Sequence, residues 1–221
     1  MIKAKNVHKF YGNIEVLKGV EVHIKEGEVV SVVGESGAGK STLLQILGTL
    51  DLPTRPQEYK TEITIADESF MEMKDSDLSK FRNRNIGFVF QYHQLLPEFT
   101  ALENVMLPVK IAGEDEKNYR EKAFTLFEDL KITNKIHQKP NQLSGGEAQR
   151  VAVARALIMS PKIIYADEPT GNLDSKNAEG LHRLFFDLRD KYNQTFIIVT
   201  HNLGLAKVTD RKLTIVDGMI A

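Results

Sequence analysis

Leu143-Ser144-Gly145-Gly146-Glu147 decides the fold of this chain, because a phosphate-binding loop precedes it and an apolar run ending in two acids follows it. Upstream, residues 34–41 read Gly-Glu-Ser-Gly-Ala-Gly-Lys-Ser and match every fixed position of the P-loop pattern. The β-branched run 29–33 stands before this loop and the helical stretch 42–47 stands after it, which is the context that such a loop requires. Downstream, a short apolar run ends in Asp167-Glu168. One of these patterns could arise by chance, but the ordered set predicts a phosphate-binding α/β domain.

The composition predicts one compact globular unit over residues 1–221. The chain has 42% hydrophobic content, enough for one sizeable core with an attached subdomain. Its formal net charge of -1 comes from interspersed acids and bases, which disfavours a nucleic-acid partner because phosphate neutralisation needs a basic surface. The sequence has no cysteine, which excludes disulfides, thiolate metal sites and cysteine nucleophiles. Its apolar stretches are far shorter than the roughly 20 residues of a bilayer span, so work at a membrane would need a spanning partner.

Short β-branched runs separated by turns and helical patterns predict a mixed α/β fold. The runs before the P-loop, before Asp167 and before His201 are almost entirely apolar, which is typical of parallel strands covered by helices on both faces. Ligands gather at the carboxyl ends of such strands. The predicted strands are residues 20–24, 29–33, 63–65, 86–90, 163–166, 196–200 and 213–216.

Between residues 91 and 160 the β signal nearly disappears and helical patterns dominate. We interpret 91–160 as a helical subdomain inserted into a nucleotide-binding core with a β subdomain, formed by 1–90 and 161–221. The chain has no internal repeat and no evident linker, and we expect no regulatory domain after Ala221. The predicted helices here and beyond are residues 101–111, 116–130, 147–159 and 175–191.

The glycines of the P-loop let backbone amides approach phosphate oxygens where a Cβ would stand in the way. We expect Lys40 to reach the β- and γ-phosphates and Ser41 to bind Mg²⁺ through its hydroxyl. Thr42 lies at the helix start, where amides and dipole favour phosphate. An isolated motif of this kind could also be an ordinary glycine-rich turn. The candidate nucleotide-binding residues here are Gly34, Glu35, Ser36, Gly37, Ala38, Gly39, Lys40, Ser41 and Thr42.

Asp167 and Glu168 end an apolar strand, where successive side chains alternate in direction and so can take different tasks. Asp167 suits the Mg²⁺ site and Glu168 suits the attacking water, because a catalytic base must lie within hydrogen-bond reach of its nucleophile. A lone Asp-Glu-Pro could equally be a solvated acidic turn closed by Pro169. The P-loop upstream favours the catalytic interpretation.

The P-loop, the Leu-Ser-Gly-Gly-Glu run and the Asp-Glu pair together resemble the ATP-binding cassette family, and the resemblance covers nearly the whole chain. It implies a P-loop ATPase fold with a mixed sheet core, an antiparallel β subdomain and an inserted helical subdomain. It also implies an ATP hydrolase that binds ATP with Mg²⁺ and powers a membrane transporter. In such proteins two copies pair, and the signature of one copy, here Ser144, Gly145 and Gly146, closes over ATP on the P-loop of the other. Locally the run could be a plain N-capped helix with Glu147 in its first turn, a role that does not compete with the functional one.

The resemblance also implies roles for five further residues. Glu168 corresponds to the catalytic base, Gln91 to the glutamine that contacts Mg²⁺ and water, and His201 to the histidine at the γ-phosphate. Asp174 corresponds to the loop that crosses the dimer interface, and Tyr11 to the aromatic residue that stacks on adenine. Asp174 could instead be only a helix cap, Tyr11 a core residue and His201 a structural histidine. The residue after the histidine is Asn rather than the more frequent Asp.

Two stretches refine the resemblance. Residues 95–105 (LLPEFTALENV) and 170–174 (TGNLD) look most like the branch of the family that releases lipoproteins from the bacterial inner membrane. This implies membrane-spanning partner subunits and a peripheral position on the cytoplasmic face. Leu95, Leu96 and Phe99 could form a docking surface for a partner helix or fill the subdomain core. The alternatives are a regulatory FtsE-like cell-division cassette and a MacB-like exporter ATPase. Residues 54–60 lack the glycine turn common in this branch, so the sequence leaves a hairpin there open.

Overall fold

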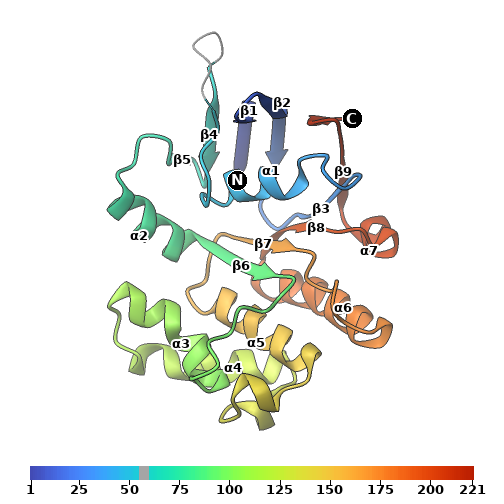
Figure 1. Ribbon diagram of the computed structural model, residues 1–221. Coiled ribbons are helices and arrows are strands. Elements are labelled where there is room, and N and C mark those ends of the chain that lie inside the picture. The colour runs from blue at the N-terminus through green and yellow to red at the C-terminus, as the bar shows by residue number, and fades with distance from the viewer. Residues whose placement is uncertain (55–59) are drawn as a thin grey trace.

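The structure, a computed structural model, describes residues 1–54 and 60–221, in which two β-sheets lie above a group of helices (Figure 1). The question of a hairpin over residues 54–60 falls largely on residues 55–59, outside the described residues. The larger sheet has the strand order β10-β9-β3-β8-β7-β6, and the smaller has the order β2-β1-β4-β5. The predicted mixed α/β fold is confirmed.

The larger sheet is mixed, because β9, β3, β8, β7 and β6 run parallel while β10 is antiparallel to β9. Its three central strands are almost fully buried apolar runs, as expected for strands covered on both faces. The register pairs Val32 with Val199, Asp167 with Val199, and Phe90 with Asp167, so the carboxyl ends of four strands meet at one edge. The strands are β3 (Val29–Val33), β6 (Ile86–Phe90), β7 (Ile163–Asp167), β8 (Thr195–Val199), β9 (Arg211–Val216) and β10 (Met219–Ile220).

The smaller sheet is antiparallel, and the first strand of the chain, β1, lies within it. A tight turn at Gly12-Asn13, with φ 59° at Gly12, joins β1 to β2. The sequence analysis missed β1 and found only the end of β2, because lysines and a histidine interrupt the apolar residues there. The strands are β1 (Ile2–Tyr11), β2 (Ile14–Ile24), β4 (Glu62–Ile65) and β5 (Glu68–Ser69).

Three helices, α3, α4 and α5, pack against one another below the larger sheet, where the sequence predicts helices (Figure 1). The boundaries of the proposed subdomains stay a prediction. The sequence analysis missed α2, whose only buried residue is Phe81 and which therefore carries no apolar stripe. The helices are α1 (Lys40–Leu47), α2 (Asp75–Asn85), α3 (Ala101–Ala112), α4 (Lys117–Asp129), α5 (Gly145–Leu157), α6 (Ser175–Tyr192) and α7 (Leu203–Val208), with 3₁₀ turns at Thr133–Lys135 and Pro140–Gln142.

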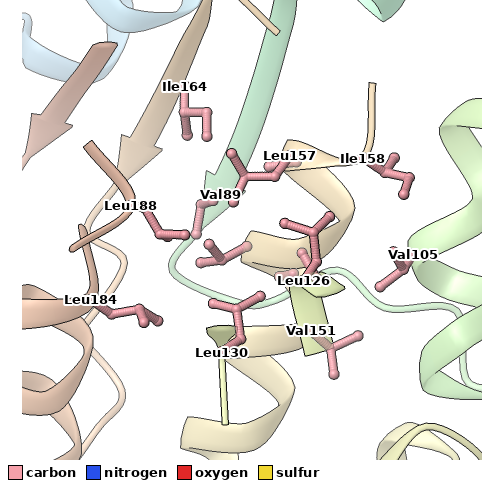
Figure 2. Packing of buried hydrophobic residues seen from close by; sticks show 14 of the residues in the cluster. Val89, Val105, Leu126, Leu130, Val151, Leu157, Ile158, Ile164, Leu184 and Leu188 are labelled. Atoms are coloured by element: carbon pink, nitrogen blue, oxygen red, sulfur yellow. The ribbon is translucent and has the colours of Figure 1, made fainter. Parts of the chain in front are cut away.

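Two apolar clusters cover the two faces of the larger sheet. In the first, Val89 and Ile164 of the sheet belong to one cluster with Leu126 of α4, Leu130 at the C-cap of α4 and Leu157 of α5, as Figure 2 shows. Burying one such side chain stabilises the fold by roughly 1.5–3 kcal/mol, so this cluster holds the helices against the strands. The second cluster joins α1 and the antiparallel sheet to the other face. None of the described helices is long and apolar enough to cross a membrane.

Candidate nucleotide site

The P-loop connects β3 to α1 and needs glycine at two close approaches. A Cβ on Gly34 would lie 2.3 Å from the Ile215 carbonyl oxygen, and one on Gly39 would lie 2.9 Å from Leu17 Cδ2. Gly39, with φ 104°, is the N-cap of α1 and offers no side chain to the first amides of the helix. The sequence therefore leaves these amides free of a side-chain cap at the point where an anion would meet the helix dipole.

Lys40 is buried at the first position of α1, with 7% of its surface exposed. Its Nζ donates to the carbonyl oxygens of Gly34 and Glu35 at 2.9 and 2.8 Å. These two bonds fold the side chain back across the loop, so the ammonium charge lies within the loop itself. A buried cation beside free amides makes the loop a strong site for phosphate.

Ser41 and Asp167 meet at the carboxyl edge of the sheet. The Ser41 hydroxyl donates to Asp167 Oδ1 at 3.3 Å, although the two residues are far apart in the chain. Burial raises the pKa of the Asp167 carboxyl, while the Ser41 hydrogen bond and the charge of Lys40 act in the opposite direction. A hydroxyl oxygen and a carboxylate oxygen side by side are ligands that Mg²⁺ accepts, so these two residues fit the ion.

Glu168 and His201 form a second pair beside the first. Glu168 has φ 45°, so the extended strand conformation ends at this residue, while its backbone N–H still donates to the Val199 carbonyl of β8 at 2.9 Å. His201 Nε2 lies 3.2 Å from Glu168 Oε1, and the His201 backbone N–H donates to Oε2 at 3.3 Å. Oε1 is nonetheless buried without a well-aligned hydrogen bond among the described residues. An under-satisfied buried carboxylate oxygen has acceptor capacity left for a bound molecule.

Gln91 follows β6 at the same edge but turns toward a different partner. Its Nε2 donates to Asn172 Oδ1 at 3.4 Å, and Asn172 Nδ2 donates to the Gln91 carbonyl at 3.2 Å. A Cβ on Gly171 would lie 2.9 Å from Gln91 Nε2, so glycine makes room for this side chain. The sequence analysis did not single out Asn172, because only the fold brings the two loops together.

Ser144 caps α5 through a capping box, in which its hydroxyl accepts from the Glu147 N–H at 3.3 Å and its own N–H donates to Glu147 Oε2 at 2.8 Å. A Cβ on Gly146 would lie 3.0 Å from Asn177 Oδ1, and Asn177 also donates to Asp174, the N-cap of α6. The predicted local roles of Ser144 and Asp174 as helix caps are confirmed. Asn177 is a link that the sequence analysis missed.

Tyr11 ends β1 with 48% of its surface exposed, so the interpretation of it as a core residue is wrong. Its hydroxyl donates to Asp51 Oδ2 at 2.9 Å, a partner that no motif indicated. In the stretch after Gln91, Leu95 is buried and fills the core, whereas Leu96 is 43% exposed. The core interpretation is therefore confirmed for Leu95 and wrong for Leu96, and a docking surface in this stretch stays a prediction.

Comparison with known proteins agrees with this geometry. A family profile described as ABC transporter matches residues 17–171. The chain is 56% identical to the lipoprotein-releasing system ATP-binding protein LolD of Bacteroides thetaiotaomicron, over 100% of this chain and 99% of that protein. It is 48% identical to the LolD protein of Bdellovibrio bacteriovorus over 98% of each.

The solved structures that resemble this chain are also ATP-binding cassettes. A dimeric post-hydrolysis state of the ATP-binding cassette MJ0796, bound to ADP and Pi, is 42% identical and superposes with a TM-score of 0.87, covering 100% of this chain and 96% of that one. The Clostridium perfringens protein cbiO1, part of the ABC transporter complex cbiONQ, has a TM-score of 0.89 at 26% identity, over 100% and 86% of the two chains. With a family profile spanning most of its length and full-length relatives above half identity, this chain belongs to the ATP-binding cassette family, as an ABC transporter ATPase domain.

Proposed function

We propose that this chain is the ATP-hydrolysing subunit of a complex that releases lipoproteins from the bacterial inner membrane. The observation that carries the proposal is end-to-end similarity to lipoprotein-releasing ATP-binding proteins of several bacteria, at 44–56% identity over 98–100% of this chain. Two copies would work with LolC/LolE-type transmembrane subunits and lie peripherally on the cytoplasmic face of that membrane.

The P-loop is proposed to hold the ATP phosphates. Lys40, already buried in the loop, would exchange its bonds to Gly34 and Glu35 for the β- and γ-phosphate oxygens. The amides of residues 34–42 would receive the remaining phosphate charge, with Tyr11 under the adenine. Ser144, Gly145, Gly146 and Asp174 would close the site from the second copy.

Mg²⁺ is proposed to bind at Ser41 and Asp167, with Gln91 joining them. The pairing of a hydroxyl with a carboxylate oxygen at 3.3 Å supports this set. The ion would neutralise charge on the phosphates. To bind Mg²⁺, Gln91 would have to break its hydrogen bond to Asn172. Asn172 lies in the segment 170–174 that also carries Asp174, so Mg²⁺ binding would alter a contact of that segment.

Glu168 is proposed as the general base that takes a proton from the attacking water. Its Oε1 is buried and poorly satisfied, which leaves an acceptor at the edge of the site. His201 would hold the carboxylate in place and contact the γ-phosphate, since it touches both oxygens of Glu168 in this structure. Phosphoryl transfer depends mainly on positioning and charge neutralisation, and this set of residues supplies both.

The test is affinity purification of the chain from its own membranes, followed by identification of the bound proteins. We expect transmembrane subunits with large extracytoplasmic domains, and trapped lipoprotein when ATP is withheld. Cell-division proteins would instead support the FtsE-like alternative, and a single exporter subunit the MacB-like one. Either result would overturn lipoprotein release and leave the ATPase assignment intact.

A further inference from the structure

Tyr11 is an exposed aromatic residue that is nevertheless held in place. Its hydroxyl donates to Asp51 Oδ2 at 2.9 Å, and Lys9 Nζ lies 5.0 Å from the centre of its ring. Almost half of the residue remains exposed to solvent. Fixing an exposed side chain in this way costs conformational entropy, and contacts at both the hydroxyl and a ring face restrict the freedom of Tyr11 before any ligand binds.

The groups that hold Tyr11 are themselves fixed. Lys9 is 9% exposed, and its Nζ donates to Asp51 Oδ1 at 2.7 Å and to the Leu52 carbonyl at 2.8 Å. Asp51 also accepts from the Leu52 N–H at 2.7 Å. Burial acts to raise the pKa of the Asp51 carboxyl, but the hydrogen bonds from Lys9 and Tyr11 outweigh it and leave the pKa below its usual value. Asp51 is therefore an anion with both oxygens in use.

This cluster adjoins the phosphate-binding helix. Asp51 lies beyond the end of α1, and its N–H donates back to the Gln45 carbonyl of that helix at 3.3 Å. The Thr42 hydroxyl interacts with the Tyr11 phenol and acts to lower its pKa, against the larger effects of burial and Asp51. The pinned ring thus lies beside the first turn of the helix whose amides face the phosphates.

We propose that Asp51 and Lys9 are positioning residues that fix the ring of Tyr11 as a rigid surface on which the base of the bound nucleotide stacks. The inference rests on the proposed ATP site. Lys9 occupies one face of the ring, and the exposed remainder is available to the base. A ring ordered before binding loses less side-chain entropy when the base arrives, so the contacts around Asp51 strengthen nucleotide binding without touching the nucleotide.

A matched arrangement elsewhere in the chain provides the control. Tyr192, at the end of α6, donates its hydroxyl to Asp129, and Lys191 Nζ bonds to Asp129 at 2.6 Å and lies 5.4 Å from the Tyr192 ring centre. Tyr192 immediately precedes the loop that leads into β8, so it lies at the opposite edge of the sheet from the P-loop. The chemistry is the same, but no nucleotide base is expected there.

The experiment measures the affinities of the full chain for Mg-ADP and for inorganic tripolyphosphate by isothermal titration calorimetry. Neither probe requires a catalytic cycle, and tripolyphosphate has no base. Asp51→Ala and Tyr11→Phe, which keeps the ring and removes the hydroxyl, are each expected to weaken ADP binding by about 3- to 10-fold. Tripolyphosphate affinity should change by less than about 2-fold. The double variant should lose little more than either single one, because both remove the same bond.

The controls are Asp129→Ala and Tyr192→Phe, which should leave both affinities unchanged. Thermal melting of each variant establishes that it is folded. If Asp51→Ala does not fold, Asp51→Asn replaces it in the experiment. Parental ADP affinity in Asp51→Ala and Tyr11→Phe would overturn the inference, and so would an equal loss for tripolyphosphate, which would mean that the P-loop itself had been disturbed. A parent chain that bound tripolyphosphate but not ADP would instead contradict the proposed nucleotide site.

Discussion

His201 Nε2 approaches Glu168 Oε1 at 3.2 Å while the His201 backbone N–H donates to Oε2 at 3.3 Å, so one residue contacts both oxygens of the proposed base. The two residues follow neighbouring parallel strands, β7 and β8, whose register brings Asp167 opposite Val199. The His201 side chain is 60% exposed, so the strand register and the backbone hydrogen bond, rather than burial of the imidazole, keep the two residues together. The contact between Glu168 and His201 therefore depends on the register of β7 and β8. Variants of these two residues test whether the contact serves ATP hydrolysis.

Glu168→Gln should lower ATP hydrolysis by about 100-fold or more while leaving ATP bound, because the amide keeps the shape of the side chain and cannot accept the proton of the water. Phosphate release measures the first effect. Light scattering in the presence of ATP measures the second effect indirectly, because the ATP that stays bound should hold two copies of the variant together as a persistent dimer. Hydrolysis at the parental rate would show that another group is the base.

His201→Ala should reduce hydrolysis strongly, since it removes the ring next to Glu168 Oε1 and the proposed γ-phosphate contact. Its ATP affinity should fall by less than its turnover number, because the P-loop contacts remain. The control is His137→Ala, which changes an exposed histidine beyond α4. If both variants kept parental turnover, His201 would have only a local structural role.

Asp167→Asn should abolish Mg²⁺-dependent hydrolysis and at the same time raise the melting temperature at neutral pH. Burial raises the pKa of Asp167, so its ionised form is disfavoured in the folded state. A carboxyl of this kind favours folding while protonated and loses that contribution as the pH rises through its folded pKa. The stability gain should therefore be larger at pH 7.5 than at pH 4.5. The exposed Asp217→Asn is the control, and a destabilised Asp167→Asn at pH 7.5 would contradict the argument.

Ser144→Ala separates the capping role of the signature from its proposed role in ATP binding. Ser144 and Thr100 cap α5 and α3 through capping boxes of the same geometry, each hydroxyl accepting an N–H at 3.3 Å. Both alanine variants should lose about 0.5–2 kcal/mol of unfolding free energy. Only Ser144→Ala should lose ATP-dependent pairing of the two copies, measured by light scattering in the Glu168→Gln background. If Ser144→Ala and Thr100→Ala paired equally well with ATP, Ser144 would act only as a helix cap.

Phe127→Ala should destabilise the chain by about 3–5 kcal/mol, because Phe127 is fully buried in the cluster that joins α4 to the sheet. Phe124, on the same helix, is 37% exposed, and its replacement by alanine should cost less than about 1 kcal/mol. Chemical denaturation of the two variants provides the comparison. Similar losses would mean that the cluster does not hold α4 in place.

Strands and helices that carry a local pattern of apolar residues were predictable from the sequence. The strands before the P-loop, Asp167 and His201 were found from continuous apolar runs, and α3, α4, α5 and α6 from their periodicity. β1 and α2 were missed, because β1 is rich in polar residues and α2 has a single buried side chain. The burial of such elements depends on neighbours that are distant in the chain.

The sequence by itself determined the family, the phosphate-binding loop, the two acids and the helix caps, because each depends on residue types at fixed short spacings. Only the tertiary structure decided which of these residues touch. Ser41 meets Asp167 across 126 positions, Gln91 meets Asn172 across 81, and Tyr11 meets Asp51 across 40. The physical reason is that the order and register of the strands bring remote loops to one edge of the larger sheet, and that α1 packs with the smaller sheet. No local spacing encodes either arrangement.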